Sequence, residues 1–275
     1  MKHYGLLGHP LGHTMSPPIH ERLSQLEGIE ADYTLFDIAP EDLPRRMDEL
    51  LRLDGFNVTI PYKGAVMEYM DALDDTALRY SSVNCVSIKD GRAVGYNTDC
   101  TGFLRSLKAA GGRLDGRVLM CGCGGVGRMI AVEALLHGAD LTISVKRGRE
   151  STVDEVRKIM QGRGMDCDIH ITYPDEIDGS FDTLVNATGA GMYPDVDGCP
   201  VSEDVIARAG FVYDVIYNPE ETRLMSIARR HGIPAAGGMG MLVYQAAAAH
   251  EYWTGAEYDE ADIDRLIADM HRMMI

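Results

Sequence analysis

A glycine-rich turn between an apolar strand and an apolar helix is the feature that most constrains the fold of this chain. The segment RVLMCG predicts a strand, CGGVGR a turn, MIAVEALLHG a helix and DLTISV a second strand. Gly122 permits a tight turn, Gly124 lets backbone N–H groups approach an anion, and Gly127 lets the helix pack closely on the strand. With Gly125 and Val126 at the helix start, the turn predicts a pyrophosphate site and a doubly wound, Rossmann-like unit.

The residues after the second strand indicate which dinucleotide this unit binds. NAD requires an acidic side chain there for its ribose hydroxyls, whereas the 2′-phosphate of NADP requires a cation. The chain has three cations in four positions, Lys146, Arg147 and Arg149, and no acid before Glu150. The alternative is a solvated basic loop. In a chain with a formal net charge of −16, the local reversal of sign favours NADP.

The rest of the chain predicts a second α/β unit and a helical end. Strands HYGLLG, ADYTLFDI and FNVTI alternate with helices near 16–25 and 43–52, which predicts a mainly parallel sheet. A hairpin follows, turned at residues 89–92, and the helix TGFLRSLKAAG then leads onward. From GMLVYQ the chain is expected to be helical, with its helices packed back on the first domain. We predict a first domain of residues 1–101 plus 241–275 and a dinucleotide-binding domain of residues 102–240.

Composition excludes several classes of partner. The negative charge opposes nucleic acid and anionic membrane surfaces, and no apolar run approaches the ~20 residues of a membrane span. Because MKHYGLLGHPLGH lacks a signal-peptide core, a cytoplasmic protein is expected. The six cysteines form no CxxC pair, and His9, His13 and His20 lack the partners of a zinc set. We expect reduced thiols and no metal.

One lysine stands out after the third predicted strand. In GFNVTIPYK, Phe56, Val58 and Ile60 alternate with Asn57 and Thr59 as a half-buried strand would, Pro61 ends the strand, and Lys63 follows. Taken alone, Lys63 reads as a solvated turn charge.

Further motifs carry a resemblance across residues 5 to about 255. GHPLGHTMSPPIH, GFNVTIPYK, SVNCV, GYNTD, GCGGVGR, NATGAGMYP, DVIYNPEETRLMSIARRHG and GMGMLVYQAAAAHEYWTG occur in this order. In these motifs the chain resembles the shikimate dehydrogenase family. The resemblance implies reversible reduction of 3-dehydroshikimate to shikimate with NADPH, on the route to aromatic amino acids. It also implies a substrate domain and a dinucleotide domain facing each other across a cleft.

The resemblance also implies roles for individual residues. Lys63 matches the catalytic lysine and Asp99 its carboxylate partner; an ammonium beside a developing alkoxide can donate the proton that ketone reduction needs. Positions expected to bind the substrate are Thr14, Ser16, Thr59, Asn84, Tyr217 and Gln245. Beyond the turn and the cations, positions expected to meet the cofactor are Asn186, Thr188, Met192 and Gly238. Thr14 departs from the more usual serine and adds a methyl group beside the expected carboxylate site.

Two rival functions stay open at this point. One is a quinate/shikimate dehydrogenase with a broader substrate range or use of NAD, against which stand the missing acid near Ser144 and the presence of Thr59. The other is a non-catalytic ligand sensor, which would not need both Lys63 and Asp99. A monomer and a homodimer are both compatible with the sequence.

Overall fold

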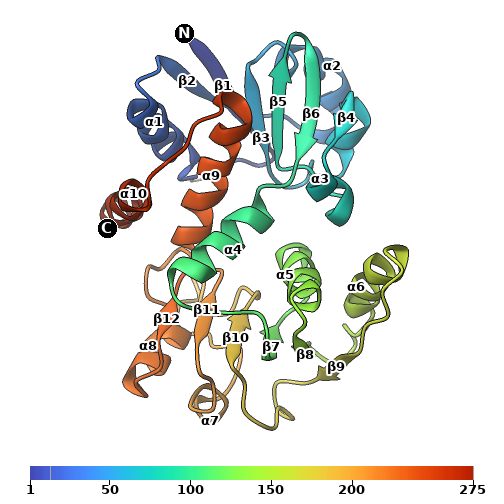
Figure 1. The fold of residues 1–275 in the computed structure, drawn as a ribbon, viewed down its shortest axis with the longest axis vertical. Helices are drawn as coiled ribbons and strands as arrows, with labels where there is room; N and C mark the ends of the chain where they lie inside the picture. The colour runs from blue at the N-terminus through green and yellow to red at the C-terminus, as the bar shows by residue number, and fades with distance from the viewer. Residues whose placement is uncertain (13, 275) are drawn as a thin grey trace. The chain divides into compact units, whose positions relative to one another are not determined.

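The computed structural model describes residues 1–12 and 14–274, so that His13 and Ile275 lie outside the described residues. The chain forms two compact units. The first comprises residues 1–102 and 243–273, and the second comprises residues 103–242. Figure 1 traces the chain through both units.

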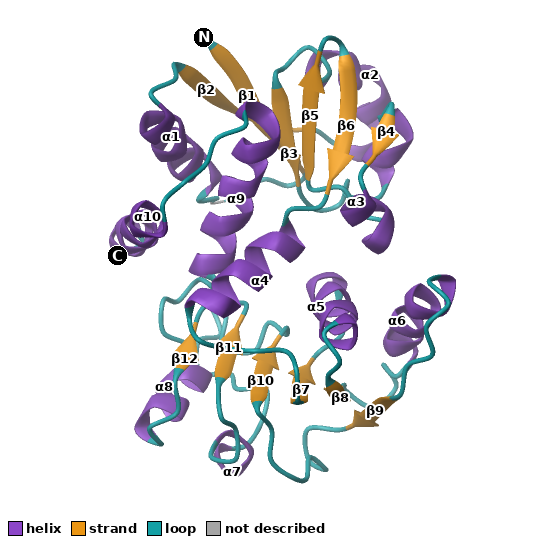
Figure 2. Ribbon diagram, in the orientation of Figure 1, coloured by secondary structure: helices purple, strands orange, loops and turns teal. Residues whose placement is uncertain are grey.

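The first unit is built on a mixed six-stranded sheet (Figure 2). Its strands are β1 (Lys2–Gly8), β2 (Ala31–Asp37), β3 (Gly55–Val58), β4 (Ala72–Leu73), β5 (Cys85–Lys89) and β6 (Arg92–Tyr96), in the spatial order β2-β1-β3-β5-β6-β4. β1 pairs in parallel with β2 and β3, and β4 pairs in parallel with β6. The expected hairpin is present as the antiparallel pair β5–β6, and Asp90 and Gly91 in its turn both have positive φ.

Helices cover this sheet and close the first unit. They are α1 (Ser16–Glu27), α2 (Leu43–Leu50), α3 (Asp75–Tyr80) and α10 (Glu260–Met273), with the short 3-10 turns η1 (Pro40–Asp42) and η2 (Ala65–Tyr69). α4 (Asp99–Ala109) and α9 (Met239–Thr254) each contribute residues to both units. Near the end of α9, Trp253 stacks on Tyr4 of β1 at 4.3 Å and donates a hydrogen bond to the carbonyl oxygen of Val86. A side chain on Gly55 would collide with Trp253, so the strand needs glycine there. The expected return of the C-terminal helices to the first domain is confirmed.

The second unit has a six-stranded sheet in which every pairing is parallel. Its strands are β7 (Arg117–Cys121), β8 (Asp140–Ser144), β9 (Ile169–Thr172), β10 (Thr183–Asn186), β11 (Val212–Asp214) and β12 (Ala235–Ala236), in the order β12-β11-β10-β7-β8-β9. The helices of this unit are α5 (Gly125–Leu136), α6 (Ser151–Gly162), α7 (Glu203–Ile206) and α8 (Arg223–Arg230). The crossover of β7, α5 and β8 is the predicted strand, turn, helix and strand, and the Rossmann-like α/β fold is confirmed.

Several sequence-based expectations differ from the structure. β3 is buried on both faces and is not half-buried, because Asn57 lies inside and accepts a hydrogen bond from the Tyr33 hydroxyl at 2.8 Å. Ile60, expected as the last inward residue of that strand, lies beyond its end and is 74% exposed. β9 was not expected from the sequence, because the strand has only four residues and is only partly buried.

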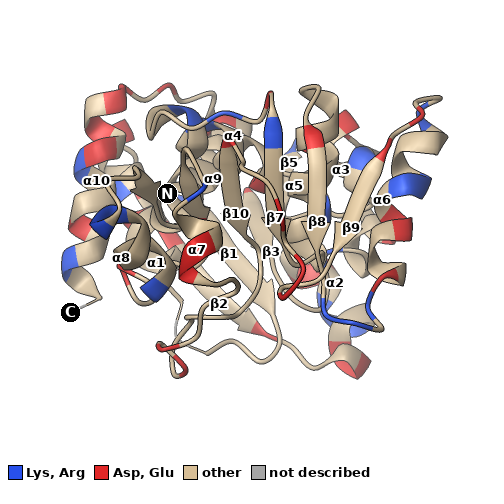
Figure 3. Cartoon of the chain, turned by 90° about the horizontal axis from the view of Figure 1, so that it is seen from below, with Lys and Arg blue, Asp and Glu red and all other residues tan. Residues whose placement is uncertain are grey.

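Many of the charged side chains on the helices are exposed, so that water solvates them. Figure 3 shows acidic and basic residues along α6 and α10 and acidic residues on α7. Among the described residues, none of the helices is both long and apolar enough to cross a membrane.

Candidate active site

A lysine and an aspartate form a close ion pair in the first unit. The Nζ atom of Lys63 lies 2.6 Å from Oδ2 of Asp99, and both side chains are mostly buried. Lys63 comes shortly after β3, and its carbonyl oxygen accepts a hydrogen bond from the backbone N–H of Val83. Asp99 is the first residue of α4, where the helix dipole favours a negative charge. The lysine is therefore held at its backbone and at its charged end.

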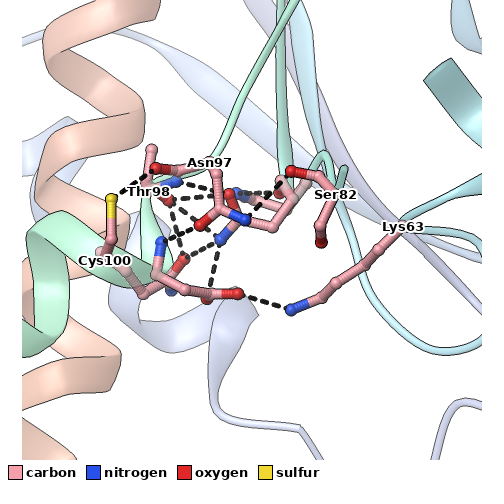
Figure 4. Close-up of polar contacts among 9 residues, drawn as sticks. Lys63, Ser82, Asn97, Thr98 and Cys100 are labelled. Atoms are coloured by element: carbon pink, nitrogen blue, oxygen red, sulfur yellow. Dashed lines mark hydrogen bonds and ion pairs between the residues drawn. The ribbon is translucent and has the colours of Figure 1, made fainter. Parts of the chain in front are cut away.

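Asn84 orients the carboxylate of Asp99 from the other side. Its Nδ2 atom donates to Oδ1 of Asp99 at 2.8 Å, and its Oδ1 atom accepts from the backbone N–H of Thr98 at 2.6 Å (Figure 4). Oε1 of Gln245 lies 3.5 Å from the same Nδ2 atom and 3.4 Å from the Thr98 hydroxyl. Because Asn84 is buried, these contacts leave its amide one orientation.

A further layer of hydrogen bonds supports this group. Oδ1 of Asn97 accepts from the backbone N–H of Asp99, and its Nδ2 atom donates to the carbonyl oxygen of Ser82, as Figure 4 shows. The backbone N–H of Asn97 donates to the Thr76 hydroxyl, which itself donates to Asp74. Sequence reasoning assigned no role to Asn97 or Thr98, although both stand in the GYNTD motif. Their position directly after a strand and before a helix was the available signal.

The expected substrate-binding residues divide between the units. Thr14, Ser16, Thr59, Asn84 and Gln245 belong to the first unit, and Tyr217 belongs to the second. The Thr14 hydroxyl lies 3.2 Å from the Ser16 hydroxyl and accepts a hydrogen bond from the Ser16 backbone N–H. Both residues are only partly buried, so their hydroxyl groups can also serve a ligand.

A cavity of about 730 Å³ opens in the second unit at the carboxyl ends of β7, β8 and β10. Ligands of doubly wound folds bind at this edge of the sheet. Gly122 and Gly124 line the cavity beside Cys123, and Thr188 lines it from the loop after β10. Burial raises the pKa of Cys123 to about 11, so its thiol is neutral at pH 7.

The three motif glycines differ in what surrounds them. A Cβ atom on Gly127 would lie 2.7 Å from the carbonyl oxygen of Gly122, so the helix packs on the turn through this glycine. Gly122 itself has a φ of +86°, which L side chains rarely adopt. A Cβ atom on Gly124 would meet nothing within 4 Å. The open side at Gly124, within the cavity, fits a pyrophosphate approaching the backbone.

The three predicted cations have different surroundings. Lys146 and Arg149 line the cavity. Arg147 does not line it and forms ion pairs with Asp175 and Glu176. Two cations at the cavity wall fit the 2′-phosphate of NADP.

The remaining expected cofactor residues also differ in exposure. Asn186 is fully buried, accepts hydrogen bonds from Thr188 and donates to Asp214, so it shapes the loop after β10. Met192 is half exposed. A Cβ atom on Gly238 would lie 2.1 Å from the carbonyl oxygen of Val215, so only glycine fits there.

Comparison with known proteins places this arrangement in a family. The family model described as the shikimate dehydrogenase substrate binding domain matches residues 6–86, and that of the shikimate 5′-dehydrogenase C-terminal domain matches residues 238–265. A shikimate dehydrogenase (NADP⁺) of Caldanaerobacter subterraneus is 38% identical over 262 residues, which cover 94% of each chain. The chain belongs to the shikimate dehydrogenase family.

Solved structures of related proteins agree with this. Shikimate 5-dehydrogenase of Thermus thermophilus, in complex with NADP(H) and shikimate, has a TM-score of 0.84 at 30% identity, covering 98% of this chain and all of that one. The ligand-free 5-ketofructose reductase of a Gluconobacter species has a TM-score of 0.83 at 29% identity, covering 98% of each chain. The fold of the shikimate dehydrogenase family thus also occurs in a reductase named for another ketone.

Proposed function

We propose that this protein catalyses the reversible reduction of 3-dehydroshikimate to shikimate with NADPH, in aromatic amino acid biosynthesis. The observation that carries the proposal is the pairing of Lys63 with Asp99, held by Asn84, in a unit that matches the family's substrate-binding domain. The NADP-dependent relatives and the cations at the cavity wall support the choice of cofactor.

The chemistry of the two charged groups follows from their placement. The nicotinamide supplies the hydride when NADPH is bound. Lys63 donates a proton to the carbonyl oxygen as negative charge develops on it, and in the reverse direction takes the proton back. Asp99 forms a charge-assisted hydrogen bond with the Lys63 ammonium group and fixes its position. Asn84 keeps the carboxylate turned toward the lysine.

The substrate and cofactor assignments of single residues belong to the same proposal. Hydroxyl and amide groups suit a ligand with one carboxylate and three hydroxyl groups. The substrate set is Thr14, Ser16, Thr59, Asn84, Tyr217 and Gln245. The cofactor set is Gly122, Gly124, Gly125, Val126, Gly127, Lys146, Arg147, Arg149, Asn186, Thr188, Met192 and Gly238.

Broader properties complete the proposal. We infer a first domain of residues 1–101 plus 241–275 and a dinucleotide domain of residues 102–240, which lie close to the two compact units. We also infer a cytoplasmic protein, present as a monomer or a homodimer. The acidic composition supports the absence of nucleic-acid partners.

Nicotinamide absorbance during oxidation of shikimate and of quinate, each with NADP⁺ and NAD⁺, tests the proposed reaction. We expect fast turnover with shikimate and NADP⁺ only. Comparable rates with quinate or NAD⁺ would instead assign a dual-specificity enzyme, and no turnover with any pair would favour a ligand sensor.

Lys63→Ala tests the assigned proton donor. Loss of general acid catalysis should lower kcat by about 10² to 10⁴. The dissociation constant of shikimate should change little, because other groups bind the substrate. Lys89→Ala, at the exposed end of β5, is the matched control. A Lys63→Ala enzyme with near-normal kcat would refute the role.

A further inference from the structure

The Arg147 side chain is held by two carboxylates that are remote from it in sequence. Its Nη2 atom lies 2.5 Å from Oε1 of Glu176 and 3.2 Å from Oδ2 of Asp175, and its Nη1 atom lies 3.4 Å from Oδ1 of Asp175. The guanidinium carbon also lies 4.2 Å from the centroid of the Tyr173 ring. Arg147 is thus fixed by charge and by stacking on the segment that follows β9.

This segment is tied a second time to the loop between β8 and α6. The Tyr173 hydroxyl donates to Oε1 of Glu150 at 2.9 Å, and the backbone N–H of Gly148 donates to the same oxygen at 3.0 Å. Tyr173 therefore stays in place as a platform for the guanidinium even when Arg147 loses its carboxylate partners.

The acidic pair stands next to the wall of the dinucleotide cavity. Lys146 and Arg149, on either side of Arg147 in the chain, both line the cavity. Pro174, which directly precedes Asp175, lines it as well. A 2′-phosphate held by these two cations would therefore lie near Arg147 and near the carboxylates that hold it.

The ion pairs of Arg147 are weak enough for a bound phosphate to break. The side chains of Arg147, Asp175 and Glu176 are 52%, 72% and 55% exposed. Exposed pairs contribute only about 0 to 1 kcal/mol. A phosphate dianion can form charge-assisted, bidentate hydrogen bonds with the same guanidinium. The two carboxylates therefore compete with a phosphate for Arg147.

We propose that Asp175 and Glu176 are specificity-determining residues that hold Arg147 away from the 2′-phosphate and so limit the preference for NADP over NAD. The inference rests on the proposed use of NADP. Because NAD has no 2′-phosphate, its binding does not require Arg147 to be released.

Calorimetric titration of the full chain with NADP⁺ and with NAD⁺ tests the proposal. In the double variant Asp175→Asn/Glu176→Gln, the dissociation constant of NADP⁺ should fall about 3- to 10-fold, as expected for loss of exposed charge interactions. The constant for NAD⁺ should change less than about 2-fold. Arg147→Gln should weaken the binding of NADP⁺ more than that of NAD⁺. In the Arg147→Gln protein, the double substitution should lose most of its effect on NADP⁺ affinity.

Asp178→Asn is the matched control, since Asp178 forms a similar exposed ion pair with Arg208 and does not line the cavity. Unchanged NADP⁺ affinity in the double variant would overturn the inference. An equal gain in affinity for NAD⁺ and for NADP⁺ would overturn it as well. An equal gain in the Arg147→Gln background would also overturn it, because the carboxylates would then act without Arg147. If the unsubstituted protein binds NAD⁺ as tightly as NADP⁺, the proposed use of NADP is contradicted, whatever the variants show.

Discussion

The side-chain amide of Asn84 donates to one carboxylate oxygen of Asp99, while Lys63 contacts the other. The aspartate therefore has a neutral partner and a charged partner on opposite oxygens. A carboxylate held by the lysine alone could rotate together with the lysine side chain. Because Asn84 is buried at the end of the β5–β6 hairpin and holds the other oxygen of Asp99, the hairpin also fixes the direction in which Lys63 points.

Asn84→Ala should impair chemistry more than it impairs binding. It frees one oxygen of Asp99 and leaves the buried N–H of Thr98 without its acceptor, at a cost of about 1–3 kcal/mol in stability. Misplacement of the pair should lower kcat about 10- to 100-fold. Ser87→Ala, which removes one buried hydrogen bond to Tyr252 in the same hairpin, is the control for stability alone. A folded Asn84→Ala enzyme with normal kcat would show that Asp99 does not depend on this contact.

Alanine at Gly127 should lower stability, whereas alanine at Gly124 should lower NADP⁺ affinity. Gly127→Ala places a methyl group against the backbone of Gly122 and should lower the free energy of unfolding by about 1–3 kcal/mol. Gly124→Ala has free space and an extended backbone, so stability should hold within about 0.5 kcal/mol. Its NADP⁺ affinity should nevertheless fall, because the new methyl group stands where the pyrophosphate approaches. Thermal melts with and without NADP⁺ measure both effects, and unchanged affinity in Gly124→Ala would argue against a pyrophosphate at this position.

Asp214 should make the protein less stable as pH rises from about 4 to 6. Burial raises the pKa of Asp214 from its ordinary value of 3.8 to about 6, against the effect of its hydrogen bonds from Thr222, Ile216 and Asn186. Within this window the folded state binds more protons than the unfolded state, so this group's contribution to stability falls with rising pH. The difference between these two pKa values corresponds to about 3 kcal/mol of stability.

Asp214→Asn should remove that slope. Relative to the unsubstituted protein, the variant should gain about 2–3 kcal/mol between pH 4 and pH 7, measured by urea unfolding across the range. Parallel stability curves for the two proteins would contradict the raised pKa.

Glu27→Gln should weaken the packing of α1 against α9. Glu27 accepts hydrogen bonds from the buried His250 ring and from the Tyr258 hydroxyl. Burial raises the pKa of Glu27, but these hydrogen bonds outweigh it and hold the pKa below its usual value. The stabilisation is therefore present above the unfolded pKa and lost as pH falls.

At pH 7 the substitution should cost about 1–3 kcal/mol, and the difference should shrink near pH 4. Thermal unfolding at both pH values measures it. The exposed Glu30→Gln is the control, and an equal effect of the two substitutions would exclude a role for the buried contacts.

The glycine turn was predictable because its strand, glycines and helix lie in one short segment. The pairing of Lys63 with Asp99 joins residues 36 apart, and only the resemblance to a family pointed to it. The prediction for β3 was wrong at Asn57 for the same reason, since its partners Tyr33 and Asn84 are 24 and 27 residues away. A polar residue in a strand reads as exposed until its distant partner is known.

The cation loop shows the same limit. Two of the three predicted cations, Lys146 and Arg149, line the cavity, but the local sequence did not separate Arg147 from them. The acids that distinguish Arg147 follow 28 and 29 residues later, after a strand that was not predicted.

The two-residue turn of the β5–β6 hairpin has a consequence for engineering this protein. The register that pairs Cys85 with Tyr96 brings Asn84 and Thr98 together at the open end of the hairpin. Strand side chains alternate between faces, so a slip of one residue would point Asn84 away from Asp99. A loop graft at Asp90 and Gly91 would therefore alter turnover through strand register alone, although it touches none of the reacting groups.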